Sequence, residues 1–205
     1  GAEKQLIFAL SKRRGPAGGL PMDVGVLVQN VGTAFAAYEA VGFGRPLLQR
    51  VLTVTGSAVE HPKNLLARVG TTFEDIVAFC DGLGEDAGKV ISGGPMMGVA
   101  QYSLDASVTK GTSGIVVLSR DEIPQFVSDA CIRCGRCVTA CPMRLNPSAL
   151  SIFVERMHFD DAGEHNVSDC IECGCCAYVC PSKRPLVQHF RRAKAELRKR
   201  ARKAG

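Results

Sequence analysis

The sequence predicts an α+β protein built from more than one domain. Its 205 residues are enough for one or two hydrophobic cores, and 46% of them are hydrophobic, which is too apolar for a largely disordered chain. Residues 47–120 alternate β-branched segments with one helix signal, as expected for a small sheet packed on a helix. Residues 121–187 contain two similar cysteine runs around a helical segment, which indicates a separate metal-binding domain.

Residues 1–46 are expected to combine helices, a loop and one short strand. A helix is expected near the start, and the basic residues 12–14 suit its C-terminal end because of the helix dipole. Glycine and proline make residues 15–21 a loop by composition. The apolar segment at 24–28 then favours a buried strand.

A second helix is expected over residues 34–41. Asn30 and Thr33, just before it, are both suitable N-cap residues. A strand, a polar turn and a helix N-terminus also make a reasonable phosphate-binding corner, because the first N–H groups of a helix are free. From spacing alone, the N-cap is the favoured interpretation.

Residues 47–120 are expected to form a β-grasp-like module. Four strands are predicted, at residues 50–55, 64–69, 89–92 and 115–118. The helix is expected to begin after Thr71 or Thr72 and to run to about Phe79. The glycine-rich segment 93–98 lacks the spacing of a phosphate loop, so we interpret it as a tight turn.

The most informative feature is a pair of cysteine runs that both follow the pattern C-x2-C-x2-C-x3-C-P. The first run consists of Cys131, Cys134, Cys137 and Cys141, followed by Pro142. The second run consists of Cys170, Cys173, Cys176 and Cys180, followed by Pro181. Bacterial ferredoxins hold a [4Fe–4S] cluster with such a run. Two of them in tandem are a strong indication of two clusters.

Cluster chemistry accounts for this spacing. Each iron of the cube takes one outside ligand, and thiolate is the soft ligand that it prefers. Two-residue gaps let three cysteines of one loop reach three corners, and in two-cluster ferredoxins the fourth cysteine serves the other cluster. Applied here, one cluster is bound by Cys131, Cys134, Cys137 and Cys180. The other cluster is bound by Cys170, Cys173, Cys176 and Cys141.

Zinc and disulfides are the competing interpretations of the cysteines. Zinc often takes two C-x2-C pairs, but it does not need a third and a fourth cysteine in each run. Disulfides are disfavoured because the chain shows no secretion signal. Cys175 is left over beside Cys176, where it packs near the cluster or offers an alternative ligand. Cys80 lies on an apolar helix face, and we interpret it as structural.

The rest of the cysteine region is expected to be helical. Residues 148–156 follow Pro147 and predict a helix, which favours a helical ferredoxin-like domain over a minimal two-cluster ferredoxin. Residues 188–205 are expected to form a basic C-terminal helix or tail, with eight of the 25 lysines and arginines and one glutamate. This tail suits anionic lipid, an acidic partner or simple solvation. Nothing in the sequence supports nucleic-acid binding.

Several segments outside the cysteine runs carry a resemblance to a known family. They are Gly-Gly-Leu-Pro at 18–21, Asp-Val-Gly-Val at 23–26, Gln-Asn-Val-Gly-Thr at 29–33, residues 51–56, Gly-Gly-Pro-Met-Met-Gly at 93–98, Lys-Gly-Thr at 110–112, and residues 131–134 and 169–174. Together with the cysteines, they resemble the C-terminal portion of the RnfC family, the C subunits of the Rnf ion-translocating electron-transport complex. The likeness extends over essentially the whole chain. The first residues, Gly-Ala-Glu-Lys, fit a fragment or a trimmed chain.

The resemblance implies three parts. Residues 1–46 correspond to the C-terminal part of the NADH- and FMN-binding domain, which is shared with the NADH-oxidising subunit of respiratory complex I. Residues 47–120 correspond to a soluble-ligand-binding β-grasp (SLBB-like) module. Residues 121–187 correspond to a helical ferredoxin-type domain with two [4Fe–4S] clusters, followed by the basic tail at 188–205.

The resemblance also implies contacts to the flavin and the nicotinamide. In the related NADH-oxidising subunits, a Gly-Glu-Glu segment approaches the nicotinamide, and an Asn-Val-x-Thr turn lies beside FMN. By this likeness Glu3, Asn30 and Thr33 are the candidate FMN and NADH contacts, whereas Ala2 departs from the pattern. FMN and NAD(H) are expected cofactors of the full-length protein, and this chain alone is expected to be an electron carrier.

Rnf complexes are translocases that pass electrons between reduced ferredoxin and NAD+ and couple this flow to Na+ or H+ transport. The family places RnfC peripherally, on the cytoplasmic face of the bacterial inner membrane. Integral-membrane and other subunits of the complex are the expected partners, with NAD(H) as substrate and ferredoxin as an indirect partner. A soluble iron–sulfur and flavin reductase module of a metabolic compartment is the alternative.

Overall fold

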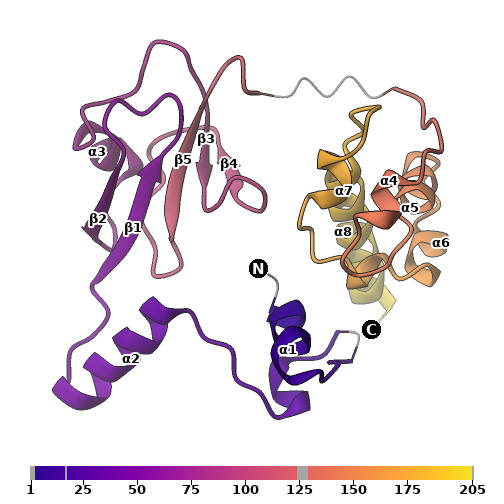
Figure 1. The fold of residues 1–205 in the computed structure, drawn as a ribbon, viewed down its shortest axis with the longest axis horizontal. Helices are drawn as coiled ribbons and strands as arrows, with labels where there is room; N and C mark the ends of the chain where they lie inside the picture. Colours follow the sequence, from indigo (N-terminus) through magenta and orange to yellow (C-terminus); the bar gives the residue numbers. More distant parts are fainter. Residues whose placement is uncertain (1–2, 17, 124–128, 205) are drawn as a thin grey trace. The chain divides into compact units, whose positions relative to one another are not determined.

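Figure 1 shows the computed structural model, which describes residues 3–16, 18–123 and 129–204. The chain divides into two compact units. One unit is Gln29–Pro124, and the other combines Gly1–Val28 with Gln125–Gly205. Each unit has its own hydrophobic core. Pro124, at the predicted domain boundary, lies outside the described residues.

The unit Gln29–Pro124 is built on a five-stranded mixed sheet (Figure 1). Its strands are β1 (Gln49–Thr55), β2 (Lys63–Arg68), β3 (Ala87–Ser92), β4 (Val99–Gln101) and β5 (Gly114–Ser119). Their order across the sheet is β2-β1-β5-β3-β4. The first and last strands along the chain, β1 and β5, are parallel neighbours, and the other pairs are antiparallel. This arrangement and the single helix α3 (Phe73–Ala78) fit the β-grasp-like module that the sequence predicts.

The core of this unit lies between the sheet and α3. Leu52 and Val54 of β1 are buried at alternate positions, as the period of two in a strand requires. They pack in one cluster with Ile115 of β5 and with Phe73 of α3. Gly56 ends β1 with φ 129°, and a Cβ atom there would lie 1.9 Å from a backbone oxygen of β5. Only glycine therefore fits this turn.

The four predicted strands and the helix of this module are confirmed. Thr72 is the N-cap of α3, since its side chain accepts the Asp75 N–H at 3.1 Å. Segment 93–98 is a tight turn, closed by Gly98 N–H donating to Gly94 O at 2.8 Å. The sequence did not predict β4, because it is only three residues long and has no buried position.

The predicted strand at residues 24–28 is wrong. Val24 ends a short 3₁₀ helix, η1 (Pro21–Val24), and the segment that follows has no strand. Asp23 accepts the Leu20 N–H at 2.8 Å, and Val26 N–H donates to Pro21 O at 3.1 Å. These local bonds satisfy the backbone within a turn, so an apolar run that suits a strand finds no partner strand.

Helix α2 (Val31–Phe43) has Asn30 as its N-cap, and the Asn30 side chain accepts the Gly32 N–H at 2.9 Å. The helix is apolar along its length, yet none of its residues is buried. Phe35, Tyr38 and Val41 are among the exposed large side chains. The apolar side chains of α2 are therefore not covered by other described residues of this chain.

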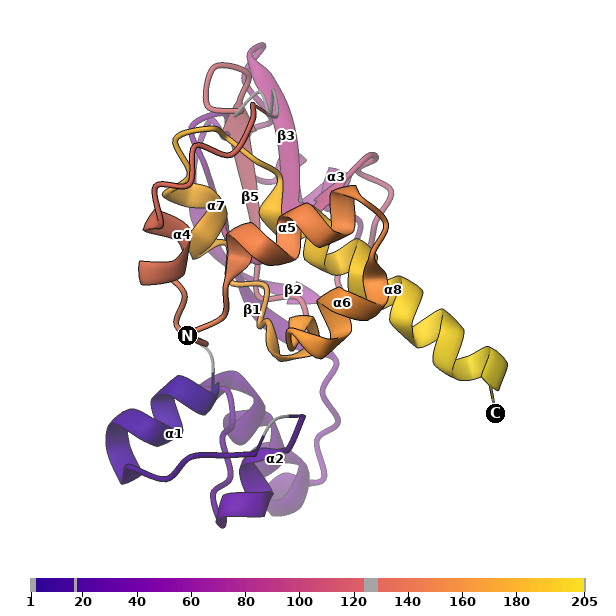
Figure 2. The ribbon, with the colours of Figure 1, turned by 90° about the vertical axis from the view of Figure 1, so that its right-hand side faces the viewer.

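The second unit is helical. Before residue 29 it contains α1 (Glu3–Ser11) and η1. After residue 129 its described helices are α4 (Arg136–Thr139), α5 (Pro147–Glu155), α6 (Phe159–Glu164), η2 (Val167–Asp169), α7 (Cys175–Tyr178) and α8 (Leu186–Ala204). Helices α5, α6 and α8 contact one another and enclose the core (Figure 2). Leu150, Val154, Phe159 and Phe190 are buried there. The predicted helix after Pro147 is confirmed, with Asn146 as its N-cap.

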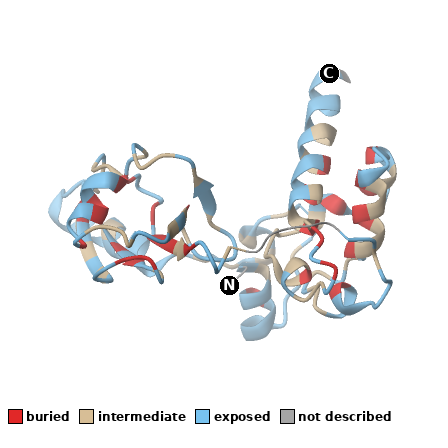
Figure 3. Ribbon diagram, turned by 90° about the horizontal axis from the view of Figure 1, so that it is seen from above, coloured by how far each residue is buried: buried red, intermediate tan, exposed pale blue. Residues whose placement is uncertain are grey.

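Helix α8 crosses the predicted limit between the cysteine domain and the basic tail. Its first half is part of the core through Leu186, Phe190 and Ala193. Its outer end is exposed, as the pale end of this helix in Figure 3 shows. The predicted domain boundary between residues 187 and 188 therefore falls inside α8. The basic residues begin within the part of α8 that still packs in the core, so charge composition does not mark the end of the packed domain. None of the helices in the described part of the chain is long and apolar enough to cross a membrane.

We predict that Thr72→Ala lowers the free energy of unfolding of the Gln29–Pro124 unit by about 1 kcal/mol, because the first turn of α3 loses its cap. Denaturant titration measures this change. Thr71→Ala is the matched control, since Thr71 precedes the cap and lies outside α3. Equal stability of the Thr72→Ala variant and the unsubstituted protein would contradict the assigned cap.

Candidate metal centres

The two cysteine runs fold into loops with matching backbones. Both loops use left-handed conformations at the same positions of the motif. These positions are Arg133 and Glu172 (φ 56° each), Gly135 and Gly174 (φ 75° and 82°), and Arg144 and Lys183 (φ 55° and 45°). Each glycine precedes a one-turn helix, α4 in the first run and α7 in the second. The sequence repeat is therefore also a structural repeat.

Each loop contributes to two separate cavities. The first cavity is lined by Cys131, Cys134, Cys137 and Cys180. The second cavity is lined by Cys170, Cys173, Cys176 and Cys141. The structure thus brings together the two sets of four that the crossed arrangement requires. That these eight side chains bind iron stays our proposal.

The short helices explain how the crossing arises. Cys137 and Cys176 lie in α4 and α7 and are buried, and these two helices contact each other. Cys141 and Cys180 follow the ends of the same helices, so each chain segment leaves its own cavity and reaches the other one. Pro142 and Pro181 come next and fix φ where the chain leaves the cysteines.

Burial affects the protonation of three of these cysteines. Burial raises the pKa of Cys176 to about 12, and burial also raises the pKa values of Cys137 and Cys170. Such thiols stay neutral at pH 7 unless a positive centre holds them as thiolates. Backbone N–H groups already donate to two of the sulfurs, from Leu145 to Cys141 and from Glu172 to Cys170, both at 3.4 Å.

The cysteines surround space rather than converge on a point. Within the described residues, no three Cys, His, Asp or Glu side chains are gathered closely enough to hold a single metal ion. The four cysteines that line each of two cavities, and the backbone N–H groups that donate to Cys141 and Cys170, fit [4Fe–4S] clusters.

The surroundings of the cavities contain polar side chains that sequence reasoning missed. At the second cavity, Glu172 accepts from Lys194 Nζ at 2.9 Å and from Arg191 Nε at 2.8 Å. Burial pushes the pKa of Glu172 upward, but these two cations outweigh it and lower the pKa below its usual value. At the first cavity lies Arg184, which is buried. The position of Arg184, four residues after Cys180, is the sequence feature that could have indicated its place beside this cavity.

The two remaining cysteines line neither cavity. Cys175 lies next to Cys176 in α7, and a hydrogen bond with the Cys173 side chain raises its pKa. Cys80 is fully buried in the core between α3 and the sheet. Burial raises the pKa of Cys80, as expected for an inert thiol.

The candidate FMN and NADH contacts belong to different units. Glu3 is exposed in the first turn of α1, and the neighbouring Ala2 lies outside the described residues. Asn30 and Thr33 are exposed at the start of α2, where the Asn30 side chain is used as the N-cap. Asn30 and Thr33 therefore lie together in one unit, and Glu3 belongs to the other.

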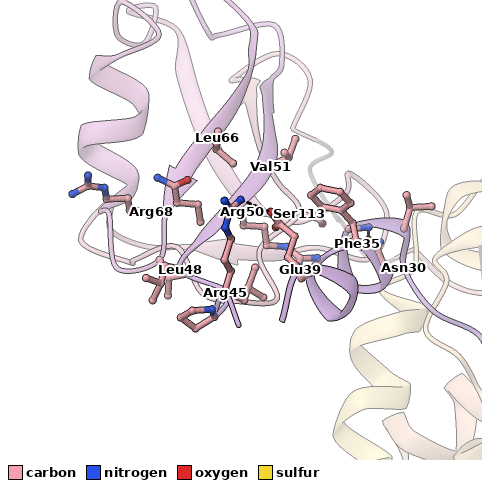
Figure 4. A pocket seen from close by; sticks show the side chains of 17 residues that line it. Asn30, Phe35, Glu39, Arg45, Leu48, Arg50, Val51, Leu66, Arg68 and Ser113 are labelled. Atoms are coloured by element: carbon pink, nitrogen blue, oxygen red, sulfur yellow. Dashed lines mark hydrogen bonds and ion pairs between the residues drawn. The ribbon is translucent and has the colours of Figure 1, made fainter. Parts of the chain in front are cut away.

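A larger cavity, of about 1150 Å³, lies in the Gln29–Pro124 unit, between α2 and the strands β1 and β2 (Figure 4). Asn30 and Phe35 line it from α2 and its cap. Arg45, Arg50 and Arg68 make it basic, and Arg50 Nε donates to Thr112 O at 2.9 Å. No cysteine lines this cavity. The cavities that are lined by cysteines are the two small ones, so cavity volume does not indicate the candidate metal centres.

Comparison with known families matches both parts of the architecture. Residues 51–100 match the SLBB domain family. Residues 123–181, which include both cysteine runs, match the 4Fe-4S dicluster domain family. The β-grasp module and the domain with two [4Fe–4S] clusters are therefore established for this chain.

Curated relatives match nearly the whole chain. The C subunit of the proton-translocating ferredoxin:NAD(+) oxidoreductase complex of Clostridium ljungdahlii is 55% identical over 97% of this chain. The C subunit of the Na(+)-translocating ferredoxin:NAD(+) oxidoreductase complex of Acetobacterium woodii is 48% identical over 96% of it. The C subunit of the ion-translocating oxidoreductase complex of Rhodobacter capsulatus is 42% identical over 98% of it. The chain spans 44%, 44% and 38% of the lengths of these relatives.

We predict that Cys141→Ser disrupts the cluster of Cys170, Cys173 and Cys176 although it changes the other run. The full-length protein, purified anaerobically, should lose about four of the roughly eight irons expected for two cubes in this domain. Iron and sulfide analysis and electron paramagnetic resonance measure this loss.

Cys175→Ser is the matched control, because Cys175 lies beside a proposed ligand and lines neither cavity. Its iron content should be unchanged. Loss of the cluster at Cys131 in the Cys141→Ser variant, with the other cluster intact, would contradict the crossed ligation. Stoichiometric zinc without sulfide in the unsubstituted domain would contradict clusters altogether.

Proposed function

We propose that this chain, which belongs to the RnfC family of C subunits of Rnf ion-translocating complexes, is the electron-carrying part of such a protein. The full-length protein, in this proposal, takes part in electron transfer between NAD(H) and ferredoxin-side carriers, coupled to ion transport by other subunits. The observation that carries the proposal is the pair of four-cysteine cavities, each built from both runs.

The eight cysteines hold and insulate the redox groups. Bound [4Fe–4S] clusters supply one-electron sites. Cys137 and Cys176 are buried and Cys170 is half-buried, and this burial raises the pKa values of all three thiols. The contact of α4 with α7 keeps the two cavities adjacent, which electron transfer between them requires.

Residues 1–46 are proposed to be the end of an NADH- and FMN-binding domain of the full-length protein. Support comes from α2, whose apolar side chains are exposed in this chain. In the full-length protein, further residues of that domain are proposed to cover them. A flavin is the chemical link, because it exchanges two electrons with NADH and single electrons with a cluster.

A contact supports the coupling of that domain to the clusters. Gln5 of α1 donates from Nε2 to Pro142 O at 3.0 Å. Pro142 and Met143 line the second cavity and directly follow Cys141. The helix that includes the NADH candidate Glu3 therefore makes a side-chain contact with a loop that lines this cavity.

The proposed partners are integral-membrane and other subunits of an Rnf complex, at the cytoplasmic face of the bacterial inner membrane. The exposed end of α8 suits this place, because it presents Arg198, Lys199, Arg202 and Lys203. Anionic lipid or an acidic partner protein is attracted to such a cluster, at about 1 kcal/mol per cation near an anionic surface.

We predict that the full-length protein, isolated from membranes in mild detergent, co-purifies with integral-membrane subunits. High salt should release it, because a peripheral protein held by basic residues is sensitive to screening. Immunoblotting of membrane and soluble fractions measures the distribution. Recovery only as a soluble species without such subunits would favour the alternative, a soluble iron–sulfur and flavin reductase.

We predict that Glu3→Gln in the full-length protein raises the KM for NADH by about tenfold. This factor corresponds to the loss of one hydrogen bond to a charged group. Steady-state oxidation of NADH at varied NADH concentrations measures the KM. Glu74→Gln is the control, since Glu74 is an exposed carboxylate on α3. An unchanged KM in the Glu3→Gln variant would remove Glu3 from the NADH site.

A further inference from the structure

The first cavity contains a buried guanidinium group that the cysteine motif does not explain. Arg184 lines this cavity together with Cys131, Cys134, Cys137 and Cys180. The whole residue is only 5% exposed. Arginine keeps its charge at every accessible pH, and a buried charge is costly unless each of its N–H groups finds an acceptor.

Most of the guanidinium is paired. Nη1 donates to Asp129 O at 3.2 Å, and Nη2 donates to Ser151 Oγ at 2.9 Å. Nη2 also forms an ion pair with Glu155. These partners fix the plane of the group, because the guanidinium nitrogens are rigidly related.

One donor has no partner. Among the buried side-chain nitrogens and oxygens of the described residues, Nε of Arg184 is the one without a hydrogen-bond partner. A buried donor left in this state costs about 1–3 kcal/mol. The residue lines a cavity whose other chemistry is four cysteine sulfurs, so an anionic acceptor in that cavity accounts for the free N–H.

We propose that Arg184 tunes the cluster of the first cavity, with Nε–H donating to a sulfur of that cluster or of its cysteines. The proposal rests on the cluster assignment in the proposed function. Reduction adds one negative charge to a cluster, and a nearby cation and an N–H donor both stabilise that charge. Arg184 therefore raises the reduction potential at the first cavity.

Glu155 modulates this effect from the other side of the guanidinium. Its carboxylate pairs with Nη2 and is partly exposed, with 38% of its side chain accessible. The pair lowers the net positive charge that the first cavity experiences. Removing the carboxylate while keeping Arg184 is therefore expected to shift the potential in the opposite direction from removing Arg184.

The second cavity provides an internal reference. Its charged neighbour is Glu172, which is paired with Lys194 and Arg191. Arg184 does not line it. A change at Arg184 should thus act on one cluster and leave the other as a measure of intact folding.

The test is a redox titration of the full-length, anaerobically purified protein, followed by electron paramagnetic resonance. Cys134→Ser and Cys173→Ser variants assign the two signals to their cavities. Arg184→Met should shift the potential at the first cavity to more negative values, with a roughly tenfold lower ratio of reduced to oxidised cluster at a fixed potential, or about 59 mV for one electron. The potential at the second cavity should not change.

Two further variants keep the test decisive. Glu155→Gln should shift the first potential to more positive values, and this result decides the case if Arg184→Met fails to assemble its cluster. Arg156→Gln removes an exposed arginine at the end of α5 and should shift neither potential.

An unchanged first potential in Arg184→Met, with both clusters present, would overturn the proposal. If the Arg184→Met variant fails to assemble its cluster, the proposal would be overturned by a Glu155→Gln variant whose first potential does not shift to more positive values. An unsubstituted protein without two clusters would instead overturn the proposed function, so the two failures are distinguishable.

Discussion

The exchange of Cys141 and Cys180 between the two cysteine loops is the constraint on which the helical unit depends. Each cavity takes three cysteines from one loop and the fourth from the other. Neither cavity can be complete unless α4 and α7 lie against each other. The hydrophobic core of α5, α6 and α8 holds the loops in that arrangement, so formation of the metal centres and folding of this unit are coupled.

The polar groups inside this unit are consistent with that coupling. Ser151 is fully buried, and its hydroxyl group contacts both Arg184 Nη2 and His189 Nδ1. Burial lowers the pKa of His189, so the ring is neutral at pH 7 and adds no charge beside the guanidinium. A buried network of this kind is favourable only when every member is satisfied. For Arg184, the Nε–H group is proposed to find its acceptor in the first cavity.

Local signals determined most of the elements that the sequence predicts correctly. Thr72 and Asn146 start helices because their side chains cap free N–H groups. The β-branched runs form β1, which buries one face, and β5, which is buried at nearly every position. The two failures have different causes. Residues 24–28 have the composition of a strand but no partner strand, and β4 is too short and exposed to leave a pattern.

The sequence by itself determined the chemistry: eight cysteines in two repeats, and the division of these cysteines into two sets of four. These are properties of residue type and spacing, which the chain carries locally. Only the tertiary structure decided which other side chains surround the cysteines. Arg184, Glu155 and Ser151 meet because α5 and α8 pack together. Lys194 of α8 reaches Glu172, which lies in the second cysteine loop before α7, and α7 in turn contacts α8. Contacts between distant segments depend on packing in three dimensions, which residue spacing does not encode.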